Sequence, residues 1–167
     1  MNTMNKLALL VVLIALTITL SAQSKSYRIY DEFSGRDGFT FMAFSKSMID
    51  AVNLNIDEEN KKITGDLMEV RILISNREKN KEMGSLSKLF AGKFDKSGYR
   101  KVEPSDNKEE NNVEFWIDGN SKTVKECHVI VSDSEDSQFS CLVSFYGNFK
   151  VEDLKSFEKF SRKQAEK

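Results

Sequence analysis

Apolar side chains recur at helical spacing in several stretches of the chain. In the clearest stretch they stand at i, i+3, i+4 and i+8 between residues 86 and 94, which predicts an amphipathic helix. Ser85 is suited to cap the start of this helix, and Gly98 to end it in a left-handed conformation. The same kind of spacing predicts short helices over residues 27–35 and 45–52 and a closing helix over residues 151–160.

Other stretches are compact and apolar, or alternate between apolar and polar residues, and these predict strands. Alternation is plain from Met68 to Ser75. Asp118-Gly119-Asn120 is a typical hairpin turn between apolar runs at residues 113–117 and 123–131. Further strands are predicted over residues 38–44, 99–102 and 139–146.

The order of these elements indicates an α+β fold. Helices and strands alternate at first, and a three-strand antiparallel meander and a final helix follow. We therefore expect a two-layer sandwich, with the helices packed on one face of a mixed or antiparallel sheet.

The first residues are typical of a secretory signal. Lys6 precedes an apolar run from Leu7 to Leu16, and small residues follow at Ser21-Ala22. We predict a signal peptide over residues 1–22 and a single α+β domain over residues 23–167, located in the periplasm or secreted. The alternative is an uncleaved N-terminal anchor, although the run is short for a membrane span of about 20 residues. We expect no stable span after cleavage.

Charge and composition argue against several classes of partner. The chain carries 25 basic and 26 acidic side chains, a formal net charge of −1. Nucleic-acid binding calls for a basic patch or stripe, which this balance does not indicate. An anionic membrane surface is disfavoured for the same reason.

A resemblance to a known family is carried by four segments, Tyr30 to Phe33, Phe41 to Ile49, Val70 to Leu73 and Leu142 to Leu154. These segments resemble domain of unknown function 4252, a family found in exported proteins of Gram-negative bacteria. The resemblance implies an exported α+β domain, with no known activity and no catalytic residues or cofactors to carry over. Many members look like lipoproteins, but this chain has no cysteine near the predicted cut, so no lipid anchor is expected.

The chain has two cysteines, Cys127 and Cys141, on consecutive predicted strands. A hairpin centred on residue 134 would place them directly opposite each other on one face of the sheet. In an oxidising compartment they would then form a cross-strand disulfide that contributes about 3 kcal/mol by the chain-entropy estimate. The alternative is two buried free thiols that pack as small apolar groups.

The remaining polar features do not form a recognisable catalytic or metal site. His128 is the only histidine, lies on the face opposite Cys127, and is expected to be a surface or edge residue. The acidic turn Asp133 to Asp136 lacks the ligand spacing of a calcium loop. We predict no catalytic residues, no metal and no cofactor.

Three functional hypotheses follow. The first is a periplasmic interaction or accessory module that binds an unknown envelope protein through a sheet face or edge, with Trp116 and Tyr146 as candidate contacts. Core packing is the alternative for Trp116. The second is a small-ligand binder with a cavity between sheet and helices, lined by Phe41, Phe90 and Phe145. The third is an enzyme that assembles carboxylates from distant positions.

Overall fold

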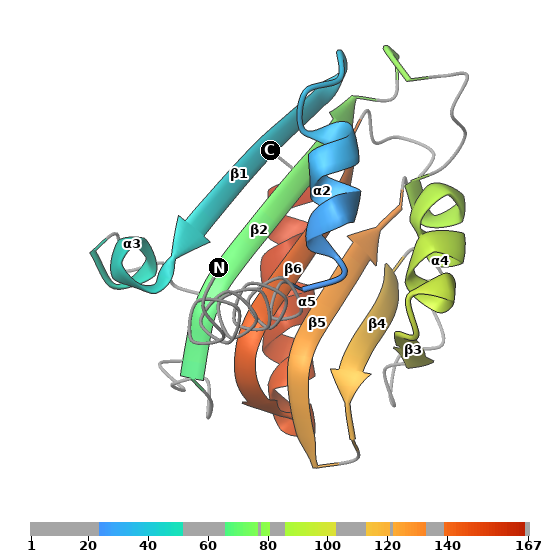
Figure 1. The fold of residues 1–167 in the computed structure, drawn as a ribbon. Coiled ribbons are helices and arrows are strands. Elements are labelled where there is room, and N and C mark those ends of the chain that lie inside the picture. The colour runs from blue at the N-terminus through green and yellow to red at the C-terminus, as the bar shows by residue number, and fades with distance from the viewer. Residues whose placement is uncertain are drawn as a thin grey trace, which may run out of the picture.

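The computed structural model describes residues 24–51, 66–76, 78–80, 86–102, 113–120, 122–132 and 139–165. The predicted signal segment 1–22, the Ser85 cap and the acidic turn 133–136 lie outside these residues. In chain order the elements (Figure 1) are α2 (Tyr27–Phe33), β1 (Phe39–Ser45), α3 (Lys46–Ala51), β2 (Asp66–Asn76), α4 (Leu86–Lys96), β3 (Arg100–Val102), β4 (Val113–Gly119), β5 (Thr123–Val131), β6 (Phe139–Lys150), the 3-10 turn η2 (Val151–Asp153) and α5 (Leu154–Ala165).

The strands form one six-stranded antiparallel sheet in the order β1-β2-β6-β5-β4-β3. The α+β class, the antiparallel sheet, the C-terminal meander of β4, β5 and β6, and the final helix are confirmed. The predicted turn is also confirmed, because the Asn120 side-chain oxygen accepts hydrogen bonds from the backbone N–H groups of Lys122 and Thr123. Strand β6 joins the meander to β2, which leaves β1 and β3 as the two edges.

Helices cover both faces of the sheet, and this corrects the expectation that they pack on one face (Figure 1). On one side, the α2–α4 face, Tyr30 and Phe33 of α2 and Phe90 and Phe94 of α4 are buried against the sheet. On the other side, the α5 face, Phe157 of α5 and Ile49 of α3 belong to a second core. The fold therefore has three layers.

The physical reason lies in the central strands. Val129 and Val131 of β5 face one core, while Ile130 between them faces the other. In β6, Val143 and Leu142 are divided between the two cores in the same way, and all of these side chains are buried. A strand that is apolar on both sides needs a covering layer on each face.

Candidate functional site

The two candidate contact residues are buried, so neither forms an exposed patch. Trp116 is 6% exposed and stacks on Phe94 of α4, with 5.9 Å between ring centroids. Tyr146 is 7% exposed, and its hydroxyl bonds to Ser26 Oγ at 2.7 Å. The prediction of an aromatic contact surface was wrong because α2 and α4 cover this face, and core packing, the alternative for Trp116, is what the structure has.

The cysteines are free and buried, and the strand register separates them. Cys127 lies opposite Phe145, and Cys141 lies opposite Val131. The two residues are therefore four positions apart along the ladder, or about 13 Å at roughly 3.3 Å per residue, beyond the reach of a disulfide. They do share the α5 face, as predicted, but the hairpin is not centred on residue 134.

The side chains predicted to line a ligand cavity do not come together. Phe90 belongs to the core of the α2–α4 face, whereas Phe145 belongs to that of the α5 face and stacks on Phe157 at 4.0 Å. Two rings on opposite sides of a sheet cannot line one cavity.

His128 lies on the face opposite Cys127, as predicted, but it is fully buried and not a surface residue. Its ring stacks on Phe94, with centroids 4.6 Å apart, and meets the edge of Tyr99 at the same distance. Nδ1 is 2.6 Å from Ser144 Oγ, on the residue directly opposite in β6. The prediction failed because α2 and α4 cover a strand that looked half exposed.

His128 is part of a buried polar network beneath α2. The Tyr30 hydroxyl donates to Ser144 Oγ at 2.5 Å, and Ser144 Oγ contacts Nδ1 of the imidazole. On the other side of the ring, Nε2 is 3.5 Å from Glu126 Oε2 and makes no hydrogen bond among the described residues. The order is therefore Tyr30, Ser144, His128, Glu126.

The geometry indicates one tautomer of the imidazole. Because Ser144 accepts from Tyr30, its own proton is available to donate to Nδ1 of His128. Nε2 then carries the ring proton and points it toward the Glu126 carboxylate, whereas the other tautomer would set a lone pair against that charge. Burial lowers the pKa of His128 below its ordinary value, although the Glu126 carboxylate opposes this effect, so the ring is neutral at neutral pH.

Glu126 joins this network to the first described residues of the chain. Its Oε2 accepts hydrogen bonds from Ser24 Oγ and the Tyr99 hydroxyl, each at 2.7 Å. Burial raises the pKa of Glu126, but the nearby His128 and the hydrogen bonds from Tyr99 and Ser24 outweigh burial and hold the pKa below its ordinary value. Burial raises the pKa of Tyr99 to about 12. The carboxylate is therefore ionised and fixes residues 24–26 on the sheet.

A serine hydrogen-bonded to a histidine, with a glutamate on the far side of the imidazole, has the components of nucleophilic catalysis. Here the serine and the histidine are both fully buried, and the serine hydroxyl already binds a tyrosine. Ser144 also lies within the regular pairing of β5 and β6 and not on an exposed turn. This arrangement supports a structural network that holds α2 in place. The sequence analysis did not predict this buried network. The one indication of it was Ser144, a polar residue within an apolar run.

Strand β1 presents an unpaired backbone edge among the described residues, because it pairs only with β2. The Asn76 N–H donates to the Gly38 carbonyl at 2.8 Å, so Gly38 directs its backbone groups toward β2. Because this direction alternates along an antiparallel strand, the even-numbered residues of β1 also face β2. Phe41, Ala43 and Ser45 consequently direct theirs away from the sheet. The Phe39 N–H also points outward but donates to the Arg36 carbonyl.

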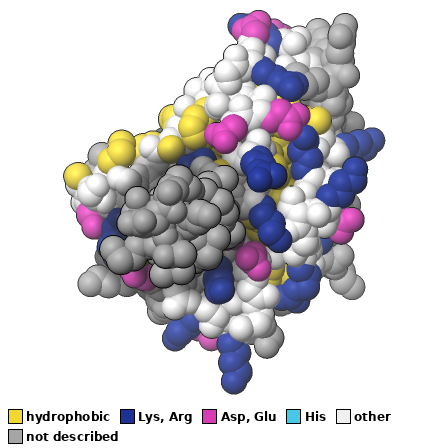
Figure 2. All heavy atoms as spheres, viewed as in Figure 1, with side chains coloured by type: hydrophobic (Ala, Val, Ile, Leu, Met, Phe, Trp, Pro, Cys, Tyr) yellow, Lys and Arg dark blue, Asp and Glu magenta, His cyan; other side chains and the backbone are white. Residues whose placement is uncertain are grey.

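Most side chains of β1 are apolar, and they are incompletely covered. Phe41 and Phe44 are half-buried, and Ala43 is exposed, as is Met48 of the neighbouring α3 at 48%. Figure 2 shows hydrophobic side chains along the margin of the molecule where β1 and α3 lie. No charged residue occurs in the seven residues of the strand, FTFMAFS.

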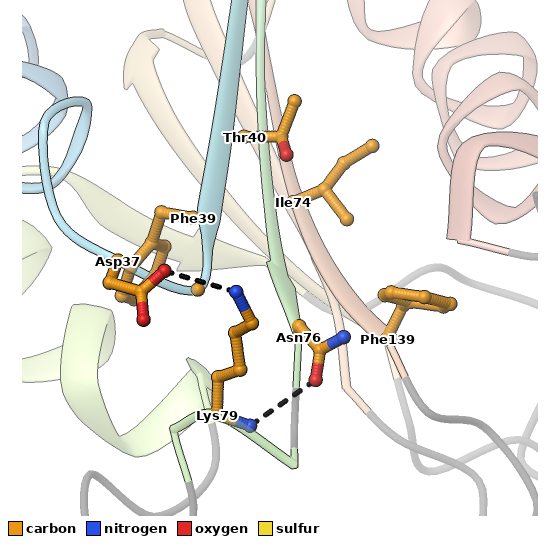
Figure 3. A pocket seen from close by; sticks show the side chains of 8 residues that line it. Asp37, Phe39, Thr40, Ile74, Asn76, Lys79 and Phe139 are labelled. Atoms are coloured by element: carbon orange, nitrogen blue, oxygen red, sulfur yellow. Dashed lines mark hydrogen bonds and ion pairs between the residues drawn. The ribbon is translucent and has the colours of Figure 1, made fainter.

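A hollow of about 230 Å³ adjoins the start of β1 (Figure 3). Lys79 spans it, donating to Asp37 Oδ1 at 3.1 Å through its ammonium group and to Asn76 Oδ1 through its backbone N–H. The hollow is formed at the end of the sheet and not between sheet and helices. Its lining is Asp37, Gly38, Phe39, Thr40, Ile74, Asn76, Lys79 and Phe139.

In the part of the chain that the structure describes, no group of three His, Cys, Asp or Glu side chains is placed to hold a metal ion. Across the same residues, no helix has both the length and the apolar character needed to cross a membrane.

Comparison with known proteins places the chain by its family. No curated protein and no solved structure matches it. The model of one family, described as a domain of unknown function (DUF4252), matches residues 30–157. This span runs from α2 into α5 and includes every strand of the sheet. The chain therefore belongs to the DUF4252 family.

Proposed function

We propose that this protein is an exported interaction module without catalytic activity, and that it binds an envelope protein along the free edge of β1. The observation that carries the proposal is the backbone of Phe41, Ala43 and Ser45, which faces away from the sheet. An extended segment of a partner would pair with these groups as an additional strand.

The contrast between the two edges of the sheet supports this proposal. Natural proteins protect sheet edges with short strands, charged residues or proline. Strand β3 is three residues long and carries exposed Arg100 and Lys101, so that edge is protected. Strand β1 is seven residues long, and it contains neither a charge nor a proline. Among the described residues, the edge left unpaired at β1 is therefore the one better suited to binding.

The absence of catalysis and the periplasmic or secreted location are parts of the same proposal. Catalysis is disfavoured because the one serine–histidine–glutamate arrangement described above is buried and internally hydrogen bonded. Export is supported by the apolar run from Leu7 to Leu16 after Lys6.

The test is a crosslinking pull-down of the mature protein from its native envelope, with mass spectrometry of the captured proteins. Ala43→Pro removes one outward N–H and leaves the pairing of β1 with β2 intact, because Ala43 is at an outward position. Ala43→Ser is the matched control, since it keeps that N–H.

We expect the wild-type protein and Ala43→Ser to capture the same saturable partner and Ala43→Pro to lose it. Circular dichroism and thermal melting verify that both variants fold. Equal capture by folded Ala43→Pro would show that β1 is not the binding edge. A wild-type protein that captures neither another envelope protein nor a second copy of this chain would refute the interaction module itself.

A further inference from the structure

We infer that the strand bound at β1 is β1 of a second copy of this chain, so that two sheets join into one continuous antiparallel sheet about a two-fold axis. This inference rests on the proposed function of β1 as a binding edge and specifies the occupant.

The backbone of β1 is compatible with pairing to itself. In an antiparallel ladder, outward-facing residues of one strand must lie opposite outward-facing residues of the other. A two-fold axis at Met42 places Phe41 of one copy opposite Ala43 of the second, and the reverse. These two pairs use the outward N–H and C=O groups that have no strand partner among the described residues.

The side chains complement each other in size in this register. On the α2–α4 face, each half-buried Phe41 would lie beside an exposed Ala43 of the other copy. On the α5 face, each half-buried Phe44 would lie beside an exposed Thr40, and the two Met42 side chains would meet at the axis. Large side chains therefore lie beside small ones, which favours close cross-strand packing.

The expected dimer is weak, because one seven-residue ladder buries far less than the roughly 1,600 Å² of a standard interface. Association should therefore depend on protein concentration, and sedimentation velocity over a dilution series will detect it. Ala43→Pro should remain monomeric at concentrations where the wild-type protein and Ala43→Ser associate.

A disulfide trap tests the register directly. Met42 at the axis is a non-hydrogen-bonded pair with Cα atoms about 4.5 Å apart, which suits a disulfide. Met42→Cys should therefore give a covalent dimer under mild oxidation. Thr40→Cys is the matched control, because Thr40 lies opposite Phe44, and the two introduced thiols would be about 13 Å apart.

The outcomes separate this inference from the proposed function. A covalent dimer from Met42→Cys but not from Thr40→Cys, with concentration-dependent association of the wild-type chain, supports the second copy as occupant. Equal crosslinking of both variants, or a wild-type protein that stays monomeric at every concentration, overturns it. If the chain is monomeric but Ala43→Pro still abolishes capture of another envelope protein, the proposed function stands and only the inference fails.

Discussion

Mild acidification should destabilise the protein first through His128. The imidazole is fully buried, and its Nε2 has no hydrogen-bond acceptor within range among the described residues, although Glu126 is 3.5 Å away. Burial holds the pKa of this ring below its ordinary value. In the unfolded chain the pKa returns to about 6.5, so below that pH the unfolded state binds a proton that the folded state does not.

The sign and the size of the effect follow from this difference. The free energy of unfolding is not reduced by His128 above pH 6.5, where the ring is neutral in both states. It falls as the pH drops below 6.5. While the ring stays neutral in the folded chain, the free energy of unfolding should fall by about 1.4 kcal/mol per pH unit. Glu126, whose pKa is lowered, contributes in the same direction but only at lower pH, near and below the ordinary range of a glutamate.

The assay is chemical denaturation at pH values between 5 and 7.5, on the wild-type protein and His128→Gln. The variant is neutral throughout, so its free energy of unfolding should lack the steep decline, whatever its stability at pH 7. Because the chain has one histidine, NMR also follows the folded imidazole directly. An equal slope in both proteins, or a folded imidazole that titrates at or above 6.5, would refute the reasoning.

Two further predictions concern the core and the backbone. Cys127 and Cys141 should resist a thiol reagent in the native protein, and both should react in denaturant. The reason is that both thiols are buried, and burial raises the pKa of Cys141 to about 12. Mass spectrometry that finds a disulfide between them would contradict the strand register. Gly147→Ala should destabilise the protein by about 1–3 kcal/mol, because the added Cβ would overlap the Asp66 carbonyl. Gly92→Ala, in open space on α4, is the control and should stabilise it by about 0.5–1 kcal/mol in thermal or denaturant melts; equal effects would refute the close approach.

The sequence by itself determined the local elements and the family. The helical spacing from residue 86 to residue 94 predicted α4, and Gly98, with a φ of +83°, follows it as expected. Alternation along the strands also assigned His128 and Cys127 to opposite faces of the sheet. These features depend on residues close together in the chain, where the periods of helix and strand are expressed directly.

Only the tertiary structure decided what covers each face, how the strands align and which strand lies at an edge. Cys127 and Cys141 miss each other because the pairing of β5 with β6 is set by packing on both sides, which the composition of the connecting turn does not encode. Trp116 and Tyr146 are buried because α2 and α4 dock from distant parts of the chain. Strand β1 lies at an edge of the described sheet because β2 pairs on its other side with the remote β6, a contact that no local pattern reveals.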